Sequence, residues 1–228
     1  KAGQLEKAEA VYNILAEINP AEAKTYHRQS FRIYDVAGKY ERAITPAKKV
    51  IDLEPKNETN HYYLGLTYFK LQKYDEARAT LVKILEINSA DRESRNLIAL
   101  VHRYQGRVAD AIAELNRVIA EDPRDAPAHH NLGNILLGLQ RYEEAATHFR
   151  AALDNNPLSA KSRTNLAVCL KKLGRIEEAV RQLNTVLDAQ ADNPEASYHI
   201  GEILFIFKRY NEALPFFVTA ADGGMIAA

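Results

Sequence analysis

The sequence predicts an all-α fold, a right-handed α-solenoid (superhelix) built from antiparallel helix pairs. Three observations support this prediction. Alanine recurs with separations of 35, 34, 34, 34, 34 and 34 residues, at Ala8, Ala43, Ala77, Ala111, Ala145, Ala179 and Ala213. Within each period the apolar residues follow helical spacing. Glycine and proline recur at fixed distances from the alanines and divide each period into two helices.

The end of the first helix in each period is marked five residues before the alanine, at a position that we call the reversal slot. It holds Gly3, Gly38, Gln72, Gly106, Gln140, Gly174 and Lys208. A residue that tolerates a left-handed backbone is favoured just past a helix end. The second helix ends twelve residues after the alanine, at Pro20, Pro55, Ser89, Pro123, Pro157 and Ala191. Proline cannot continue a helix, so one period is predicted to hold helices near residues 59–71 and 74–87.

Close packing within each helix pair is indicated by a small residue twelve positions before the alanine. This small-residue slot holds Gly65, Ala99, Gly133, Ala167 and Gly201, and Phe31 is its exception. Two helices approach closely only where side chains are short. Pro46 and Pro215 fall inside second helices, where proline costs on the order of 3 kcal/mol, so we expect kinks there.

The domain organisation follows from the period. We expect one array over residues 1–228, with a partial repeat at 1–22 and repeats at 23–57, 58–91, 92–125, 126–159, 160–193 and 194–227. Both ends are out of phase with the repeat, and neither shows the polar cap that terminal repeats need. The sequence is therefore expected to be a fragment of a longer protein.

The composition narrows the classes of partner. The 228 residues include 30 basic and 30 acidic side chains, so no overall field attracts a nucleic acid or an anionic membrane. No apolar run approaches the roughly 20 residues of a membrane helix. We therefore expect no nucleic-acid partner and no membrane insertion. The single cysteine, Cys169, excludes an internal disulfide and is compatible with a reducing, cytoplasmic compartment, although the compartment stays open.

The segment HHNLGNILLGLQRYEEA, residues 129–145, contains the residue types of several chemical sites. His129 stands where His27 and His61 stand in other repeats, which favours a packing role. A metal needs three or four converging ligands, and no His-x-x-x-His or Cys-x-x-Cys pair is present. Gly133 and Gly138 lack the Lys-Ser/Thr of a phosphate loop. We expect neither a metal nor a cofactor.

The acidic and thiol groups also have structural interpretations. Glu143 and Glu144 begin a second helix, where carboxylates favour the positive end of the helix dipole, and equivalent acids recur at Glu177 and Glu178. Cys169 lies in an apolar helical run, as a buried structural thiol does. No Ser/His/Asp or Cys/His constellation is discernible, so we predict no catalytic residue and no enzyme activity.

With these features, the sequence resembles the tetratricopeptide repeat family. The segment NLGNILLGLQRYEEAATHFRAALDNNP (131–157) carries nearly all of the family pattern, and YLGLTYFKLQKYDEARATLVKILEIN (63–88) carries most of it. The agreement in register covers essentially all 228 residues. The resemblance implies a superhelix whose first helices line a concave groove that binds a peptide or protein segment.

The predicted groove comprises the outward positions of the first helices. It holds Arg28, Arg32, Tyr62, Tyr63, Leu66, Phe69, Asn96, Leu100, Arg103, His130, Asn131, Asn134, Lys161, Asn165, Lys171, Tyr198 and His199. Apolar and aromatic residues with a polar rim usually mark an interaction site. The alternative is that some of these residues pack against neighbouring first helices.

Asn131 and Asn165 occupy equivalent positions in adjacent repeats. A side-chain amide both donates and accepts hydrogen bonds, and the family resemblance implies that these two grip an extended peptide backbone. Some family members instead hold a C-terminal carboxylate with lysine and arginine. The matching positions here include Glu195 and His199, which disfavours that mode.

Three other functions remain open alongside a protein-binding scaffold. The array is alternatively the substrate-recruiting arm of a larger enzyme, such as a glycosyltransferase. It is alternatively a scaffold that self-assembles through its terminal faces, so homo-oligomerisation stays open. An RNA-reading helical repeat is disfavoured by the neutral charge and the alanine period.

Overall fold

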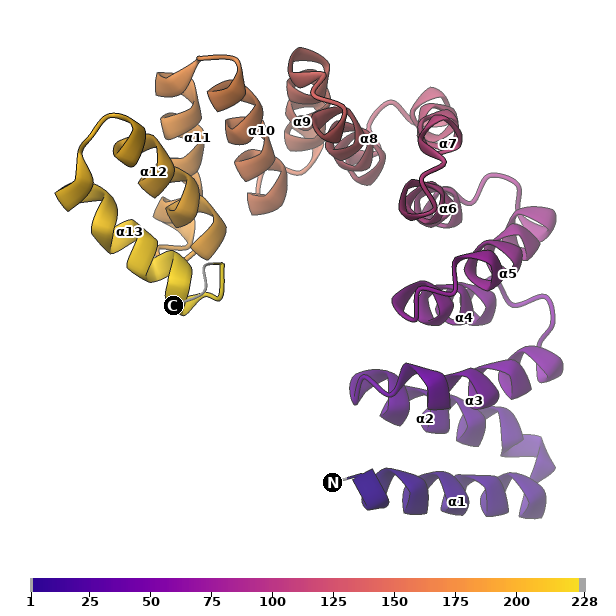
Figure 1. The fold of residues 1–228 in the computed structure, drawn as a ribbon. Coiled ribbons are helices and arrows are strands. Elements are labelled where there is room, and N and C mark those ends of the chain that lie inside the picture. The colour runs from indigo at the N-terminus through magenta and orange to yellow at the C-terminus, as the bar shows by residue number, and fades with distance from the viewer. Residues whose placement is uncertain (1, 226–228) are drawn as a thin grey trace. The chain divides into compact units, whose positions relative to one another are not determined.

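The computed structural model describes residues 2–225 and is helical throughout (Figure 1). In this part of the chain there are thirteen α-helices, one 3-10 helix and no strand. The α-helices are α1 (Ala2–Ile18), α2 (Ala23–Val36), α3 (Tyr40–Leu53), α4 (Glu58–Lys70), α5 (Tyr74–Ile87), α6 (Arg92–Tyr104), α7 (Val108–Glu121), α8 (Ala126–Gly138), α9 (Tyr142–Asn155), α10 (Ala160–Lys172), α11 (Ile176–Ala189), α12 (Pro194–Ile206) and α13 (Tyr210–Asp222). The 3-10 helix, η1, covers Pro20–Glu22.

Successive helices pack in antiparallel pairs, which confirms the predicted fold class. The pairs are α2 with α3, α4 with α5, α8 with α9, α10 with α11, and α12 with α13 (Figure 1). We call α2, α4, α6, α8, α10 and α12 the first helices and α3, α5, α7, α9, α11 and α13 the second helices. The helices predicted at 59–71 and 74–87 are found as α4 and α5, within one residue at each end.

The chain divides into two compact units, Lys1–Glu114 and Leu115–Ala228, and each is described by itself. The first unit contains α1 to α6 and the start of α7. The second unit contains the end of α7 and α8 to α13. The boundary falls in the middle of α7, between Glu114 and Leu115.

The reversal slot behaves as predicted at six of its seven positions. The backbone angle φ is positive at Gly38, Gly106 and Gly174, and also at Gln72, Gln140 and Lys208. Gly3 is different, because it lies inside α1. The reversal predicted at Gly3 is therefore wrong.

The alanines that define the period form the buried seam of the helix pairs. Ala43, Ala77, Ala111, Ala145 and Ala179 have no exposed surface. In the first unit, Leu64, Leu81, Ile84 and Leu97 pack in the same apolar cluster as Ala77. In the second unit, buried side chains include Leu132, Phe149, Leu166, Leu170 and Leu183. The alanine period is therefore a packing device, as the sequence indicated.

The interior prolines do not end their helices. α3 continues through Pro46 and α13 continues through Pro215. The kinks expected at these two residues stay a prediction.

The two kinds of helix begin in different ways. Five first helices start with a side-chain cap, in which the capping oxygen accepts a hydrogen bond from a backbone N–H three residues later. These caps are Asn57, Asp91, Asp125, Ser159 and Asn193. They are spaced by 34 residues, so they set where each of these first helices begins.

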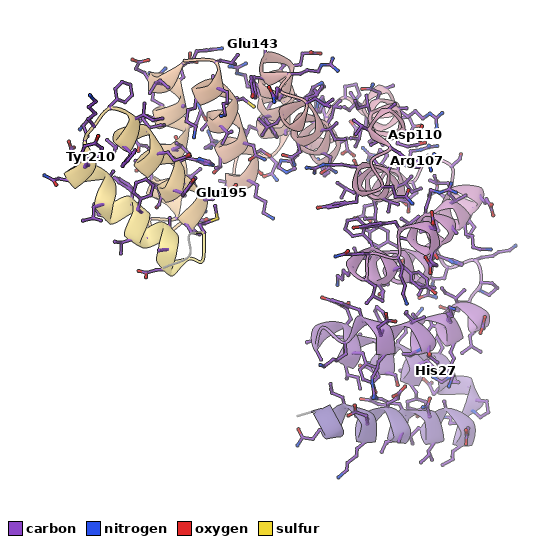
Figure 2. The ribbon with its side chains drawn as sticks, in the orientation of Figure 1. His27, Arg107, Asp110, Glu143, Glu195 and Tyr210 are labelled. Atoms are coloured by element: carbon purple, nitrogen blue, oxygen red, sulfur yellow. The ribbon has the colours of Figure 1, made fainter. Side chains whose placement is uncertain are left out.

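Four second helices begin instead with an arginine that pairs with an acid three residues later. The pairs are Arg107 with Asp110 (2.7 Å), Arg141 with Glu144 (2.6 Å), Arg175 with Glu178 (2.6 Å) and Arg209 with Glu212 (2.6 Å). Figure 2 labels Arg107 and Asp110 beside each other and Glu143 on α9. The arginine hydrogen bonds lower the pKa of the Glu144, Glu178 and Glu212 carboxyls. Glu144 and Glu178 lie in the first turns of α9 and α11, so they are helix-start residues, as predicted.

Among the described residues, no helix has the length and apolarity needed to cross a membrane.

Candidate functional site

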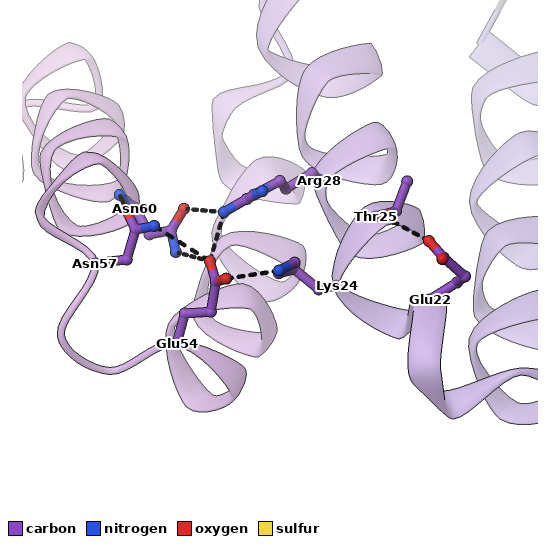
Figure 3. Close-up of polar contacts among 7 residues, drawn as sticks. All are labelled: Glu22, Lys24, Thr25, Arg28, Glu54, Asn57 and Asn60. Carbon is purple, nitrogen blue, oxygen red and sulfur yellow. Dashed lines mark hydrogen bonds and ion pairs between the residues drawn. The ribbon is translucent and has the colours of Figure 1, made fainter.

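The first-helix face of the first unit is formed by α2, α4 and α6, and its polar part is organised around one carboxylate. Glu54, just after α3, accepts hydrogen bonds from Lys24 Nζ at 2.7 Å and Arg28 Nη2 at 2.5 Å (Figure 3). Its Oε2 also accepts from Asn60 Nδ2 at 3.2 Å and from Asn57 Nδ2 at 3.3 Å. The Lys24 and Asn60 hydrogen bonds lower the pKa of Glu54. Arg28, a predicted groove residue, is therefore already paired.

A cavity of about 430 Å³, which we call the α2–α4 cavity, adjoins this cluster. It is lined by Arg28, Phe31, Arg32, Ala47, Val50 and Tyr63, among others. Three of these, Arg28, Arg32 and Tyr63, belong to the predicted groove. The volume lies within the roughly 300–1,000 Å³ of ordinary ligand pockets.

Aromatic rings form one wall of this face. Tyr63 is 49% exposed, its ring centroid lies 5.9 Å from that of Phe31, and it lies 6.3 Å from that of Tyr62. A second cavity of about 230 Å³, the α4–α6 cavity, lies on the other side of Tyr63. Its lining includes Tyr62, Tyr63 and the acids Glu58, Asp91 and Glu93. Burial first, then Glu93 and Asp91, raise the pKa of the Tyr62 phenol.

A further aromatic group lies toward the C-terminal ends of α4 and α6. The Phe69 ring meets that of Tyr104 edge to face at 5.4 Å, and Arg103 lies 5.8 Å from the centroid of Tyr104. Tyr104 is exposed.

Five predicted groove residues of the first unit lie partly or wholly in its core. Four of them are half-buried and pack against the apolar cluster: Tyr62, Leu66, Phe69 and Leu100. Asn96 is buried. Packing against neighbouring helices, the alternative that the sequence left open, therefore applies to these five residues.

The second unit presents a hydrogen-bonded network on α8 and α10. Asn134 Nδ2 lies 2.9 Å from His130 Nε2, and His130 Nδ1 lies 2.8 Å from Ser162 Oγ. Because the amide donates to Nε2, the ring proton is on Nδ1 and is donated to Ser162. Asn165 Nδ2 donates to Asn134 Oδ1 at 2.6 Å. The structure thus brings three predicted groove residues, His130, Asn134 and Asn165, into one hydrogen-bonded network.

Asn131 lies beside this network and lines a cavity of about 200 Å³, the α8–α10 cavity. His130, Lys161, Ser159 and Ser162 line the same cavity. Asn131 is half-buried, and its amide makes no hydrogen bond to any described residue. The Asn131 amide therefore has no partner for its donor or its acceptor among the described residues, whereas Asn165 donates an N–H to Asn134.

Lys171 and His199 form a third cluster, together with Glu202. Lys171 Nζ lies 2.7 Å from Glu202 Oε2 and 3.4 Å from His199 Nδ1, and His199 Nδ1 lies 2.8 Å from Glu202 Oε2. Burial lowers the pKa of His199, opposed by its hydrogen bond with Glu202. The lysine charge is thus compensated within the chain. Tyr198 meets His199 edge to face at 5.3 Å.

The other candidate groups have structural partners. His129 is buried, with Nε2 at 3.1 Å from the Pro123 carbonyl oxygen and Nδ1 at 2.9 Å from His148 Nδ1. Burial raises the pKa of the Cys169 thiol to about 11, which keeps it protonated and unreactive. Among the described residues, no group of three His, Cys, Asp or Glu side chains could hold a metal ion.

Two kinds of important residue were missed by the sequence analysis. The caps Asn57, Asp91, Asp125, Ser159 and Asn193 recur with the period, so that signal was present. Glu54 could not be found in this way, because it pairs with a cation on a different helix 30 residues away.

Known family models match the repeats of this sequence. Residues 96–160 and residues 136–203 each match a family model described as tetratricopeptide repeat. Residues 1–84 match the model for the anaphase-promoting complex, cyclosome, subunit 3. No curated protein matches the sequence.

Several solved structures share the fold. The APC/C hetero-tetramer Cut9-Hcn1 matches with a TM-score of 0.76 and 17% identity over 96% of this chain and 43% of the other. Pseudomonas aeruginosa PilF matches with a TM-score of 0.68 and 23% identity, covering 73% and 76% of the two chains. YrrB, described as a TPR protein with an unusual peptide-binding site, matches with a TM-score of 0.54 and 22% identity over 81% and 95%. Identities this low establish the fold alone.

Proposed function

Because this chain belongs to the tetratricopeptide repeat family, we propose that it is a non-catalytic scaffold that binds a peptide or protein segment on its first-helix face. The observation that supports this best is the cavities on that face. The α2–α4, α4–α6 and α8–α10 cavities are lined by predicted groove residues that include Arg32, Tyr63 and Asn131. They combine exposed aromatic surface with uncommitted polar groups.

Asn131 is the polar residue best suited to hold a peptide backbone. Its amide has no partner among the described residues, and it borders the α8–α10 cavity. An amide donates to a backbone carbonyl and accepts from a backbone N–H, which gives affinity with little dependence on peptide sequence. Asn165 supports the same surface through its hydrogen bond to Asn134. The peptide-binding site named for YrrB gives a precedent on this fold.

The test begins with a peptide library displayed on phage and selected on residues 1–228. Selected peptides are synthesised, and their affinities are measured by fluorescence anisotropy for the wild type and for the double variant Asn131→Ala, Asn165→Ala. Each lost hydrogen bond contributes about 0.5–1.5 kcal/mol, so we expect the Kd to rise about tenfold or more. Asn116→Ala, an exposed asparagine on α7, is the matched control and leaves the Kd unchanged.

Two results would contradict different parts of this proposal. An unchanged Kd for the double variant would remove the backbone grip by asparagine. Failure to select any binding peptide from a diverse library would count against peptide binding itself. Circular dichroism of each variant excludes unfolding as the cause of a weaker Kd.

A further inference from the structure

In several helix pairs, the second helix fills the space left by the small-residue slot on the first helix. A Cβ atom added to Gly65 would lie 2.8 Å from Leu81 Cδ2, and one added to Gly133 would lie 2.8 Å from Phe149 Cε1. Gly201 stands in the same relation to Phe217, also at 2.8 Å. The small residue on the first helix and the large residue on the second helix therefore fit each other.

The α2/α3 pair has this arrangement reversed. Its small-residue slot holds Phe31, and the second-helix position that holds Leu81 or Phe149 in other pairs holds Ala47. The bulk has moved from the second helix to the first. Ala47 is 5% exposed and forms part of the lining of the α2–α4 cavity together with Phe31 and Val50. The cavity thus opens where other pairs place a large second-helix side chain.

The shape and chemistry of this cavity suit an aromatic side chain. Its inner surface is apolar, at Ala47 and Val50, and the rings of Phe31 and Tyr63 flank it with an interplanar angle of 44°. Aromatic rings bury large apolar areas and prefer tilted or edge-to-face neighbours, which contribute about 0.5–1.5 kcal/mol beyond burial.

The charges around the cavity are unequal. Arg28 is paired with Glu54, and Asp35 is paired with Lys70 at 2.9 Å. Arg32 lines the cavity, is exposed, and makes no ion pair with any described residue. A guanidinium of this kind binds a carboxylate through two parallel hydrogen bonds. The edge of the cavity is therefore complementary to an acidic residue.

The neighbouring α4–α6 cavity has the opposite character. Tyr63 lines both cavities, and the α4–α6 cavity is bordered by Glu58, Asp91 and Glu93. An acidic residue is disfavoured there by repulsion from like charges. The unequal charges therefore favour a bound segment whose acidic residue lies on the α2 side of Tyr63.

We propose that the α2–α4 cavity is a specificity pocket for a peptide segment that inserts an aromatic side chain beside Phe31 and Tyr63 and places a neighbouring acidic residue on Arg32. This inference rests on the proposed function, because it names which segment the scaffold selects. The occupant is a protein segment, since the cavity lies along the face that the first helices α2 and α4 form.

The experiment selects the same displayed peptide library on the wild type and on three variants. In Phe31→Gly, Ala47→Leu the α2/α3 pair is given the arrangement of Gly65 and Leu81, which removes the Phe31 ring from the cavity lining and replaces Ala47 in that lining with leucine. Arg32→Glu reverses the charge at its edge. Lys83→Glu, at an exposed position on the second helix α5, is the matched charge-reversal control.

The wild type and Lys83→Glu are expected to enrich peptides with an aromatic residue next to Asp or Glu. The double variant, which lacks the Phe31 ring beside the inserted aromatic side chain, is expected to bind those peptides at least about tenfold more weakly. Arg32→Glu should instead enrich peptides with Lys or Arg next to the aromatic residue. This surface variant keeps the test valid if the double variant does not fold, which circular dichroism reports.

Binding peptides without the aromatic and acidic pair, or with affinities that neither variant changes, would overturn the pocket but leave the scaffold function intact. A library that yields no binding peptide on any variant would contradict the proposed function together with the pocket.

Discussion

Three of the described residues hold a left-handed backbone without being glycine. Gln72, Gln140 and Lys208 have φ angles of 58°, 60° and 59°. In an ordinary residue this conformation brings Cβ close to a carbonyl oxygen and costs roughly 1–2 kcal/mol. The helix pairs tolerate that cost because the turn between the two helices is fixed by packing on both sides.

Replacing one of these residues with glycine should stabilise the chain. For Gln72→Gly we expect the unfolding free energy to rise by about 0.5–1 kcal/mol, since relief of the backbone cost exceeds the extra entropy of glycine in the unfolded chain. Urea unfolding followed by circular dichroism measures the change. Gly106→Gln is the reverse control. An added Cβ at Gly106 meets no atom within 4 Å and φ is +75°, so its loss of stability reports backbone strain alone.

At the scale of the residue, sequence reasoning located these turns but not their partners. The period placed Gln72 and Gln140 in the same slot as Gly106, and a local backbone state is a local property. Ion pairs such as Lys171 with Glu202 depend on which helix lies alongside. That information is not carried by the spacing of residues within one period.

At the scale of the helix pair, α8 offers two glycines in opposite settings. Gly133 faces the Phe149 ring, with 2.8 Å to an added Cβ, whereas Gly138 has no atom within 4 Å of one. Gly138 is the last residue of α8, and its φ is not positive.

Gly133→Ala should therefore destabilise the chain by about 1–3 kcal/mol through overpacking, and Gly138→Ala should stabilise it by up to about 1 kcal/mol. Urea midpoints give both values. Adding Phe149→Leu to Gly133→Ala reproduces the combination of Ala99 with Leu115 and is expected to recover much of the loss. Equal effects of the two single substitutions would show that the contact with Phe149 does not limit the packing of this pair.

At the scale of the helix pair, only part of the candidate site could be predicted from the sequence. The repeat register predicted which positions of the first helices face away from the second helices. The structure places three of these residues, Arg32, Tyr63 and Asn131, beside cavities. It could not tell that Asn96 is buried. Burial there depends on how closely neighbouring first helices approach each other.

At the scale of the whole molecule, buried histidines link stability to pH. Burial lowers the pKa of His27, His102, His148 and His199 from 6.5. A folded-state pKa below the unfolded value means that the unfolded chain binds protons first as pH falls. This stabilisation is complete above pH 6.5 and is lost as pH falls through the lowered values.

We therefore expect the urea concentration at the midpoint of unfolding to decrease as the pH is lowered from about 7.5 to about 5.5, before the carboxylates titrate. The carboxylates with lowered pKa, which include Glu54 and Glu202, add a second loss below pH 4.5. His148→Gln removes one titrating ring and should flatten the first fall. A midpoint that stays constant down to pH 5.5 would mean that the four histidines titrate alike in the folded and unfolded chain.

The exchange of bulk between Phe31 and Ala47 separates two properties of a helical repeat. The period of about 34 residues determines where a helix pair lies, and it is unaffected by which of the two helices carries the large side chain. Each pair can therefore be either filled or open on its first-helix face without an insertion, a deletion or a change of register. If the α2–α4 cavity binds a peptide as proposed, exchanging a small and a large side chain within one helix pair creates a binding pocket while the period of the framework stays the same.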